Sequence, residues 1–212
     1  MSSLDFLRTH VEVALDNAEN GISKITNELI DMEGMTGIKT RHFYNNLLNT
    51  EEARYLEIGS WKGSSVCSAM CGNKATVVCI DNWSEFKGPK DEFLVNFNNY
   101  KGDNNASFIE QDCFKVDVSN LPNFNIYMYD GNHEEHSHYM ALSHYINCMD
   151  DTFIYIVDDW NWAKVRKGTL DSIKALNLNV LYTKEIFTED PVHGVKETWW
   201  NGVYIAILKK AV

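Results

Sequence analysis

Aspartates end several apolar runs of this sequence. Three runs end in Asp81, Asp112 and Asp130, and a fourth ends in the pair Asp158 and Asp159. The carboxyl ends of parallel strands open toward one crevice, so if these runs are strands we expect the carboxylates to lie close together. Clustered carboxylates repel one another unless a cation or a hydrogen-bonding ligand compensates them. The spacing therefore predicts a ligand site at one edge of a sheet.

Three of these acids have the chemistry of a metal site. Asp130, Asp158 and Asp159 offer the oxygen donors that a hard divalent cation prefers, with its remaining positions open to water and substrate oxygen. The sequence therefore predicts a magnesium site. The simpler structural interpretation is that Asp158 caps the following helix and Asp159 is solvated. His133 follows Asp130 by three residues. An imidazole there suits removal of a proton from a hydroxyl whose pKa a metal has lowered.

The neighbouring histidines do not form a zinc motif. His136 and His138 follow His133 closely, but their spacing is not that of H-E-x-x-H. No cysteine or distant histidine completes a recognisable ligand set. We expect both on the exposed surface of a helix, with a place on the pocket wall as the alternative for His138.

A glycine turn must position these acids. One apolar run ends at Gly59, and Gly63 follows in a bend that leads into a helix. Glycine permits positive φ and lets a ligand approach bare backbone. Ser64 and Ser65 can cap the amides of that helix. Asp81 follows the turn by about 20 residues, the separation at which a βαβ unit brings a carboxylate to a ribose hydroxyl pair.

The glycine spacing separates two cofactor classes. Dinucleotide sites use G-x-G-x-x-G, which seats a pyrophosphate on a helix N-terminus. Here the order is Glu57-x-Gly59-x-x-x-Gly63, so a nicotinamide-dependent dehydrogenase is not expected. The pattern resembles the E/D-x-G-x-x-x-G signature of class I S-adenosylmethionine-dependent methyltransferases. A tight strand-to-helix turn without a ligand is the other interpretation.

With its strand-end acids included, the chain resembles the metal-dependent small-molecule O-methyltransferases, both the catechol/caffeoyl-CoA type and the macrocin/aminocoumarin sugar type. The resemblance begins near Met35 and implies S-adenosylmethionine, Mg²⁺ or another divalent cation, and a hydroxylated substrate such as a sugar or an aromatic diol. It implies metal ligation by Asp130, Asp158 and Asp159 and catalytic roles for Asp130 and His133, with His133 as general base. The implied cofactor contacts are Glu57, Gly59, Ser60, Gly63, Ser64, Asp81, Asn82, Trp83, Asp112, Cys113 and Asp130.

The parts of the cofactor are also assigned by this resemblance. Asp81 matches the acid that binds ribose, and Asp112 and Cys113 match the segment beside the adenine. Trp83 either covers the adenine face or simply packs in the protein. The tryptophans at positions 160, 162, 199 and 200 likewise either form the walls of the substrate pocket or pack in the core.

Alternation of apolar runs with helical patterns predicts the fold. The strand candidates are Tyr55–Gly59, Val77–Asp81, Phe108–Asp112, Ile126–Asp130, Phe153–Asp159, Val180–Phe187 and Gly202–Leu208. Helices between the first five indicate a parallel sheet covered on both faces, and the last two predict an antiparallel pair. We therefore expect an α/β fold, a Rossmann-like three-layer sandwich with a mostly parallel seven-stranded sheet and an antiparallel last strand. Residues 1–50 would form N-terminal helices that cap a core of residues 51–212 or make contacts in a homo-oligomer.

Composition excludes several kinds of partner. The net charge of −11 disfavours nucleic acid and anionic membranes, since both require a basic surface. Five cysteines without a C-x-x-C pair indicate reduced thiols. No signal peptide or membrane span is apparent, so a cytoplasmic protein is expected.

Other functions predict different sequence features or remain open. An adenine-N6 methyltransferase would carry an N/D-P-P-Y/F stretch after the fourth strand, where this chain has Asp130-Gly-Asn-His. A metal-independent small-molecule methyltransferase remains open. So does a non-catalytic protein that binds S-adenosylmethionine or a nucleotide in a degenerate site.

Overall fold

Seven strands form one mixed sheet in the computed structural model, which describes residues 3–189 and 195–211. Their order across the sheet is β3-β2-β1-β4-β5-β7-β6. β7 runs antiparallel to both of its neighbours, and the other paired strands are parallel. The predicted fold class is therefore confirmed. The strands are β1 Arg54–Ile58, β2 Thr76–Asp81, β3 Asn105–Glu110, β4 Phe124–Tyr129, β5 Met149–Val157, β6 Asn179–Ile186 and β7 Val203–Lys209.

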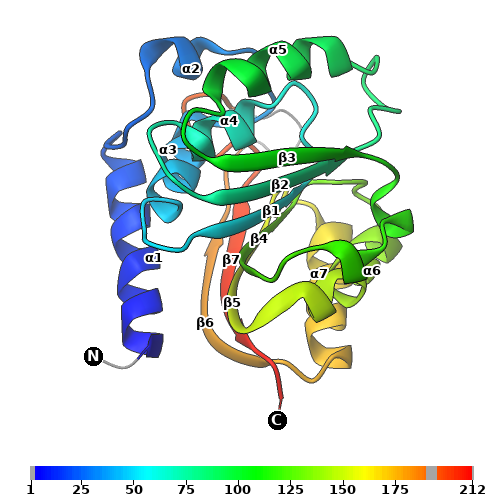
Figure 1. The fold of residues 1–212 in the computed structure, drawn as a ribbon. Coiled ribbons are helices and arrows are strands. Elements are labelled where there is room, and N and C mark those ends of the chain that lie inside the picture. The colour runs from blue at the N-terminus through cyan, green and yellow to red at the C-terminus, as the bar shows by residue number, and fades with distance from the viewer. Residues whose placement is uncertain (1–2, 190–194, 212) are drawn as a thin grey trace.

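Helices cover both faces of this sheet, as Figure 1 shows, with α1, α4 and α5 on one side and α6 and α7 on the other. The α-helices are α1 Ser3–Glu19, α2 Asn27–Asp31, α3 Ile38–Leu47, α4 Ser64–Met70, α5 Lys90–Tyr100, α6 Glu135–Tyr145 and α7 Ala163–Ala175. Three short 3₁₀ helices also occur: η1 Cys113–Lys115, η2 Val118–Asn120 and η3 Ile146–Cys148.

The central strands are apolar on both faces because both faces are buried. In β5, Ile154 and Ile156 join the core beneath α1, α3, α4 and α5. Phe153, Tyr155 and Val157 of the same strand join the core beneath α6 and α7. The two periodic sets explain why the sequence of β5 reads as a continuous hydrophobic run.

The boundaries of all seven strands differ from the predicted ones, by more than two residues only in β3 and β5. β3 ends at Glu110, because the Asp112 carboxylate accepts a hydrogen bond from the Phe114 amide (3.0 Å) and starts η1 instead. β5 begins at Met149, four residues before the predicted start. Helix α1 ends at Glu19, and Gly21 shortly after it has a φ of +66°. Residues 190–194, between β6 and β7, lie outside the described residues.

The described helices include none with the length and hydrophobicity required to cross a membrane. All five cysteines are free thiols, as expected, and Cys67, Cys79 and Cys148 are buried.

Close packing of α6 against α7 depends on Gly168. A Cβ at this position would overlap the Glu135 carbonyl oxygen and lie 2.9 Å from the Cβ of His138. We expect Gly168→Ala to lower the free energy of unfolding by about 1–3 kcal/mol, because the helices must separate. Urea denaturation monitored by circular dichroism measures this change. Lys174→Ala, on the exposed side of α7, should change stability by no more than about 0.5 kcal/mol; equal losses in both variants would contradict the interpretation.

Candidate functional site

A cavity of about 310 Å³ lies at the carboxyl ends of β2, β1 and β4. Its volume is at the lower end of the range for small-molecule sites. Three stretches of sequence meet on its wall: the turn after β1, the loop after β2 and the loop after β4. The residues on the wall that the sequence predicted for a site are Gly59, Asp81, Asn82, Trp83, Asp112, Cys113, Asp130 and His133.

The turn after β1 fits only with glycine at its first position. Gly59 has a φ of +86°, and a Cβ there would overlap the backbone of Asp130. Gly63 has a φ of +88° and immediately precedes α4. Both glycines thus adopt the left-handed conformation for which the residue was predicted. The close approach at Gly59 brings the end of β1 against the end of β4.

Asp81 holds this turn to the loop after β2. Its Oδ2 accepts hydrogen bonds from the amides of Ser60 and Trp61, each at 2.8 Å, and its Oδ1 accepts one from Trp83 at 2.7 Å. Three backbone donors therefore fix one carboxylate on the cavity wall. The Trp83 indole donates to the Trp61 carbonyl (2.8 Å) and packs on Phe93 with ring centroids 4.8 Å apart.

Glu57 lies behind the turn and is fully buried, away from the cavity wall. Its carboxylate accepts hydrogen bonds from the hydroxyls of Tyr55 (2.8 Å), Ser60 (2.9 Å) and Ser65 (2.9 Å). Burial raises the pKa of Glu57 to about 7, against the effect of these three donors. Ser60, Gly63 and Ser64 also support the turn from outside the wall. Cofactor contact by these four residues stays a prediction.

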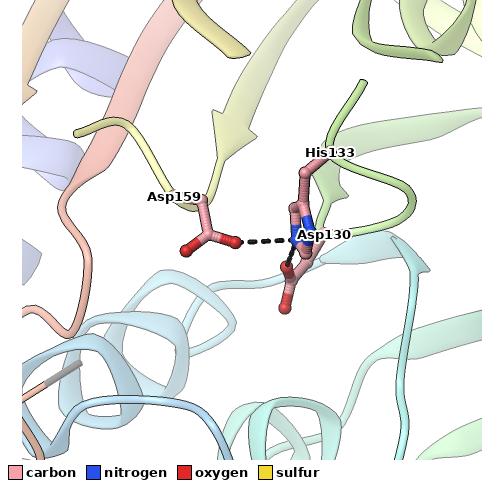
Figure 2. Close-up of side chains that lie close together, drawn as sticks. All are labelled: Asp130, His133 and Asp159. Carbon is pink, nitrogen blue, oxygen red and sulfur yellow. Dashed lines mark ion pairs between the residues drawn. The ribbon is translucent and has the colours of Figure 1, made fainter. Parts of the chain in front are cut away.

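Asp130, His133 and Asp159 come together, as Figure 2 shows. Asp130 and His133 lie on the cavity wall, and Asp159 does not. The His133 Nε2 lies 2.7 Å from Asp159 Oδ2 and 3.6 Å from Asp130 Oδ1. One ligand atom from each residue lies within 4.8 Å of the others, which suits a single cation. Asp159 is the most enclosed of the three, with 8% of its side chain exposed, against 23% for His133 and 24% for Asp130.

Asp158 is not part of this cluster. It is buried, and its Oδ1 accepts a hydrogen bond from the Asp159 amide (2.9 Å). Burial and the charges of Asp130 and Asp159 raise the pKa of Asp158 well above its ordinary range. Asp159 has a φ of +56°, an uncommon conformation for a residue with a side chain. The structure thus brings together His133 and two of the three predicted metal ligands, Asp130 and Asp159, and leaves Asp158 outside the cluster.

His133 is held as a cation in this arrangement. Although burial disfavours the charged ring, the neighbouring Asp130 and Asp159 carboxylates raise its pKa above the ordinary value. Its Nε2 makes no well-aligned hydrogen bond, so the contact with Asp159 is an ion pair. A protonated imidazole cannot accept a proton, and a general-base role requires other ligands to satisfy the two carboxylates.

Sequence patterns missed Asn201, which supports this cluster together with Trp162, one of the predicted tryptophans. Asn201, two residues before β7, donates a hydrogen bond from its amide to Asp159 Oδ1 (2.7 Å). Trp162 presents its ring edge-on to His133, with centroids 4.9 Å apart. The contact from Asn201 spans 42 positions along the chain, so no local spacing indicates it. The repeated Trp-Asn-Trp and Trp-Trp-Asn stretches were the one available signal.

Trp160, His136 and His138 do not line the cavity. Trp160 is fully buried, donates a hydrogen bond to Glu185 (2.7 Å) and stacks on Tyr204. Of the two predicted positions for Trp160, pocket wall or core, it therefore occupies the core. His136 is exposed as expected, but the expectation of an exposed His138 was wrong. His138 is buried because α6 lies against α7 at Gly168, and its ring packs edge-on to Tyr129.

The buried Glu57 makes stability depend on pH. In the unfolded chain its carboxyl loses its proton near pH 4.5, whereas in the folded chain it keeps the proton up to about pH 7. The free energy of unfolding should therefore fall by about 3 kcal/mol between these pH values, since one pKa unit corresponds to 1.36 kcal/mol. Glu57→Gln removes this contribution. Guanidinium denaturation of both proteins at pH 4.5 and pH 7.5 measures the difference; an identical pH dependence would show that the hydroxyl donors keep Glu57 ionised.

Comparisons with known proteins identify a matching domain and similar folds. Residues 56–160 match the model of a family described as "Methyltransferase domain". No match was found among curated proteins. The fold, however, is similar to many solved structures.

Three of these solved structures show that proteins with different names share this fold. An O-methyltransferase from Bacillus cereus, solved in complex with SAH, has a TM-score of 0.55 at 12% identity, over 99% of this chain and 92% of that one. Precorrin 8W decarboxylase from Methanobacterium thermoautotrophicum has a TM-score of 0.56 at 16% identity, over 88% and 96%. TrmN from Thermus thermophilus has a TM-score of 0.58 at 10% identity, over 87% of this chain and 52% of that one. Residues 56–160 therefore match a methyltransferase domain, within a fold shared with an O-methyltransferase that binds SAH.

Proposed function

We propose that this protein transfers a methyl group from S-adenosylmethionine to a hydroxyl oxygen of a small molecule. One observation carries the proposal: the cavity wall combines the end of β2, the glycine turn after β1 and the end of β4, with Asp81, Gly59 and Asp130 in that order across the sheet. This is the crevice in which parallel α/β sheets bind their ligands. The family match over residues 56–160 supports the same reaction.

The wall residues divide between the parts of the cofactor. Asp81 is suited to the ribose hydroxyls, because its carboxylate is held in place by three amides and borders the cavity. Trp83, Asp112 and Cys113 border the same cavity and would surround the adenine. When bound, the cofactor supplies an electrophilic methyl group on a sulfonium. The protein holds the acceptor oxygen in line with that methyl group, and orientation provides much of the acceleration.

A divalent cation such as Mg²⁺ fits the acids beside the cavity. Asp130 and Asp159 would hold it, since their oxygens already lie close enough to share one ion. Asp158 would orient Asp159 through the hydrogen bond that it accepts from the Asp159 amide. The ion would lower the pKa of the acceptor hydroxyl. His133, on the cavity wall, would take the hydroxyl proton on its ring once the carboxylates have another ligand.

A metal-independent methyltransferase is the second candidate. The ion pair of 2.7 Å between His133 and Asp159 favours it, because the ring already compensates the carboxylate charge. In that case Asp130 and Asp159 would orient His133 without a metal ion.

Calorimetric titration tests both parts of the proposal. We expect S-adenosylhomocysteine to bind the native protein, and Mn²⁺, as a probe for the cation, to bind with an affinity that Asp159→Asn lowers at least about tenfold. Asp159→Asn should leave the affinity for S-adenosylhomocysteine nearly unchanged. Asp171→Asn alters an exposed acid of α7 and serves as the control.

The outcomes separate the alternatives. Failure of both S-adenosylmethionine and S-adenosylhomocysteine to bind would refute the methyltransferase. Cofactor binding without Mn²⁺ binding would refute the metal site and leave the metal-independent enzyme.

A further inference from the structure

Helix α3 is polar and almost entirely buried. Eight of its ten residues, from Thr40 to Leu47, are buried, and they include an arginine, a histidine and two asparagines. Burial of such groups is costly unless each donor and acceptor finds a partner. Most of the polar groups of α3 have a partner, because the helix packs between α1 and α4 and its side chains form hydrogen bonds with the surrounding backbone.

The polar groups that face α1 and α4 are satisfied. Asn45 donates to the carbonyls of Ser68 and Cys71, each at 2.8 Å. Asn46 donates to the carbonyl of Ile22 at 2.7 Å. The His42 ring lies 2.8 Å from the Ser23 hydroxyl. These bonds account for the buried polar side chains on one part of the helix.

Three buried polar groups of α3 have no hydrogen-bond partner. They are the Thr40 hydroxyl, the Nη2 of Arg41 and the Tyr44 hydroxyl. Residues 40 and 44 are four positions apart and residues 41 and 44 are three apart, so all three lie on one side of the helix. A buried group without a hydrogen-bond partner lowers stability, and more so where the group is charged. Their position on a single side points to one ligand rather than to scattered defects.

Arg41 is the most costly of the three. It is fully buried, with Nε donating to the Thr36 carbonyl (3.1 Å) and Nη1 to the carbonyls of Leu29 (2.7 Å) and Met32 (3.0 Å). Burial lowers its pKa to about 10, so it remains a cation at neutral pH. Within residues 3–189 and 195–211 it forms no ion pair. A buried guanidinium without an anion is unfavourable, and its fork geometry suits a carboxylate.

The free end of Arg41 lies beside the cofactor turn. A Cβ on Gly34 would lie 3.1 Å from Nη2 and would overlap the Ser64 hydroxyl, so these two groups border the same point. Ser64 opens α4 directly after Gly63, and Met35, next to Gly34, is on the cavity wall. The guanidinium therefore lies just behind the wall at the glycine turn.

The Tyr44 hydroxyl lies on the other part of this side, toward the acids. Burial, together with the charges of Asp158, Asp130 and Glu57, raises its pKa well above the ordinary value, so it stays protonated and acts as a donor. The unpartnered side of α3 thus offers a cation near Ser64 and a hydroxyl donor near the acid cluster.

We propose that Arg41 binds the carboxylate of the amino-acid end of S-adenosylmethionine and its product. The inference rests on the proposed function and adds a specific ligand contact from the N-terminal segment. Because Nη2 is covered in this structure, Met35 and its neighbours must shift when the carboxylate reaches it.

Ligands that lack parts of the amino acid test this contact in the native protein. S-adenosylhomocysteine carries the carboxylate, decarboxylated S-adenosylhomocysteine lacks only that group, and 5′-methylthioadenosine lacks the whole amino-acid end. We expect calorimetry to show S-adenosylhomocysteine binding about tenfold or more tightly than its decarboxylated form, as for a charge-assisted hydrogen bond. Equal affinities would overturn the proposal.

Arg41→Met should reduce this preference to about onefold. A merely structural role in holding the segment from Leu29 to Thr36 would weaken all three ligands alike and leave the ratio unchanged, which would also overturn the proposal. Arg166→Met is a matched control, since Arg166 also donates to two carbonyls, of Trp160 and Asn161. It should retain the native ratio.

A spectroscopic measurement covers the case in which Arg41→Met does not fold. Arg41 is one of four arginines and is fully buried, so its Nη nitrogens should give slowly exchanging signals in ¹⁵N-arginine spectra. These signals should move on addition of S-adenosylhomocysteine and not on addition of the decarboxylated form; identical responses to both would contradict the contact. If none of the three ligands bound, the proposed function itself would fail.

Discussion

The site depends on how closely the backbone of β1 approaches that of β4 at Gly59. Only a residue without a Cβ fits against Asp130, and this contact sets the position of the loop that carries His133. Asp81 then ties the same turn to the loop after β2 through three amide donors. One turn therefore aligns three strand ends, and the cavity wall follows from that alignment.

Buried polar chemistry surrounds this turn on the side away from the cavity. The buried Glu57 carboxylate accepts hydrogen bonds from the hydroxyls of Ser60 and Ser65. Helix α3, which packs against α4, carries buried asparagine, histidine and arginine side chains. Such networks are favourable only when their members are satisfied, so they hold the surrounding backbone in one arrangement.

Much of the fold could be predicted from the sequence, because continuous apolar runs and turn residues are local signals. The seven strands and the acids at their ends follow from them, as does the antiparallel pair at β6 and β7. The sequence could not show that His133, and not Asp158, joins Asp130 and Asp159, because this depends on the direction of each side chain and not on its position along the chain. Asn201 and Arg41 were missed because their roles depend on contacts between distant segments. The prediction that His138 is exposed was wrong, because no hydrophobic periodicity in the sequence indicates that α6 packs against α7 at Gly168.

The antiparallel insertion of β7 has a consequence for biosynthesis. β7 lies between β5 and β6, and Asn201, two residues before it, holds the Asp159 side chain. On the ribosome, β1 to β5 emerge well before the strand that completes their sheet. A nascent chain that has produced the acids therefore still lacks the neighbour that orients one of them. The acid cluster therefore reaches its full arrangement only after translation has passed Asn201.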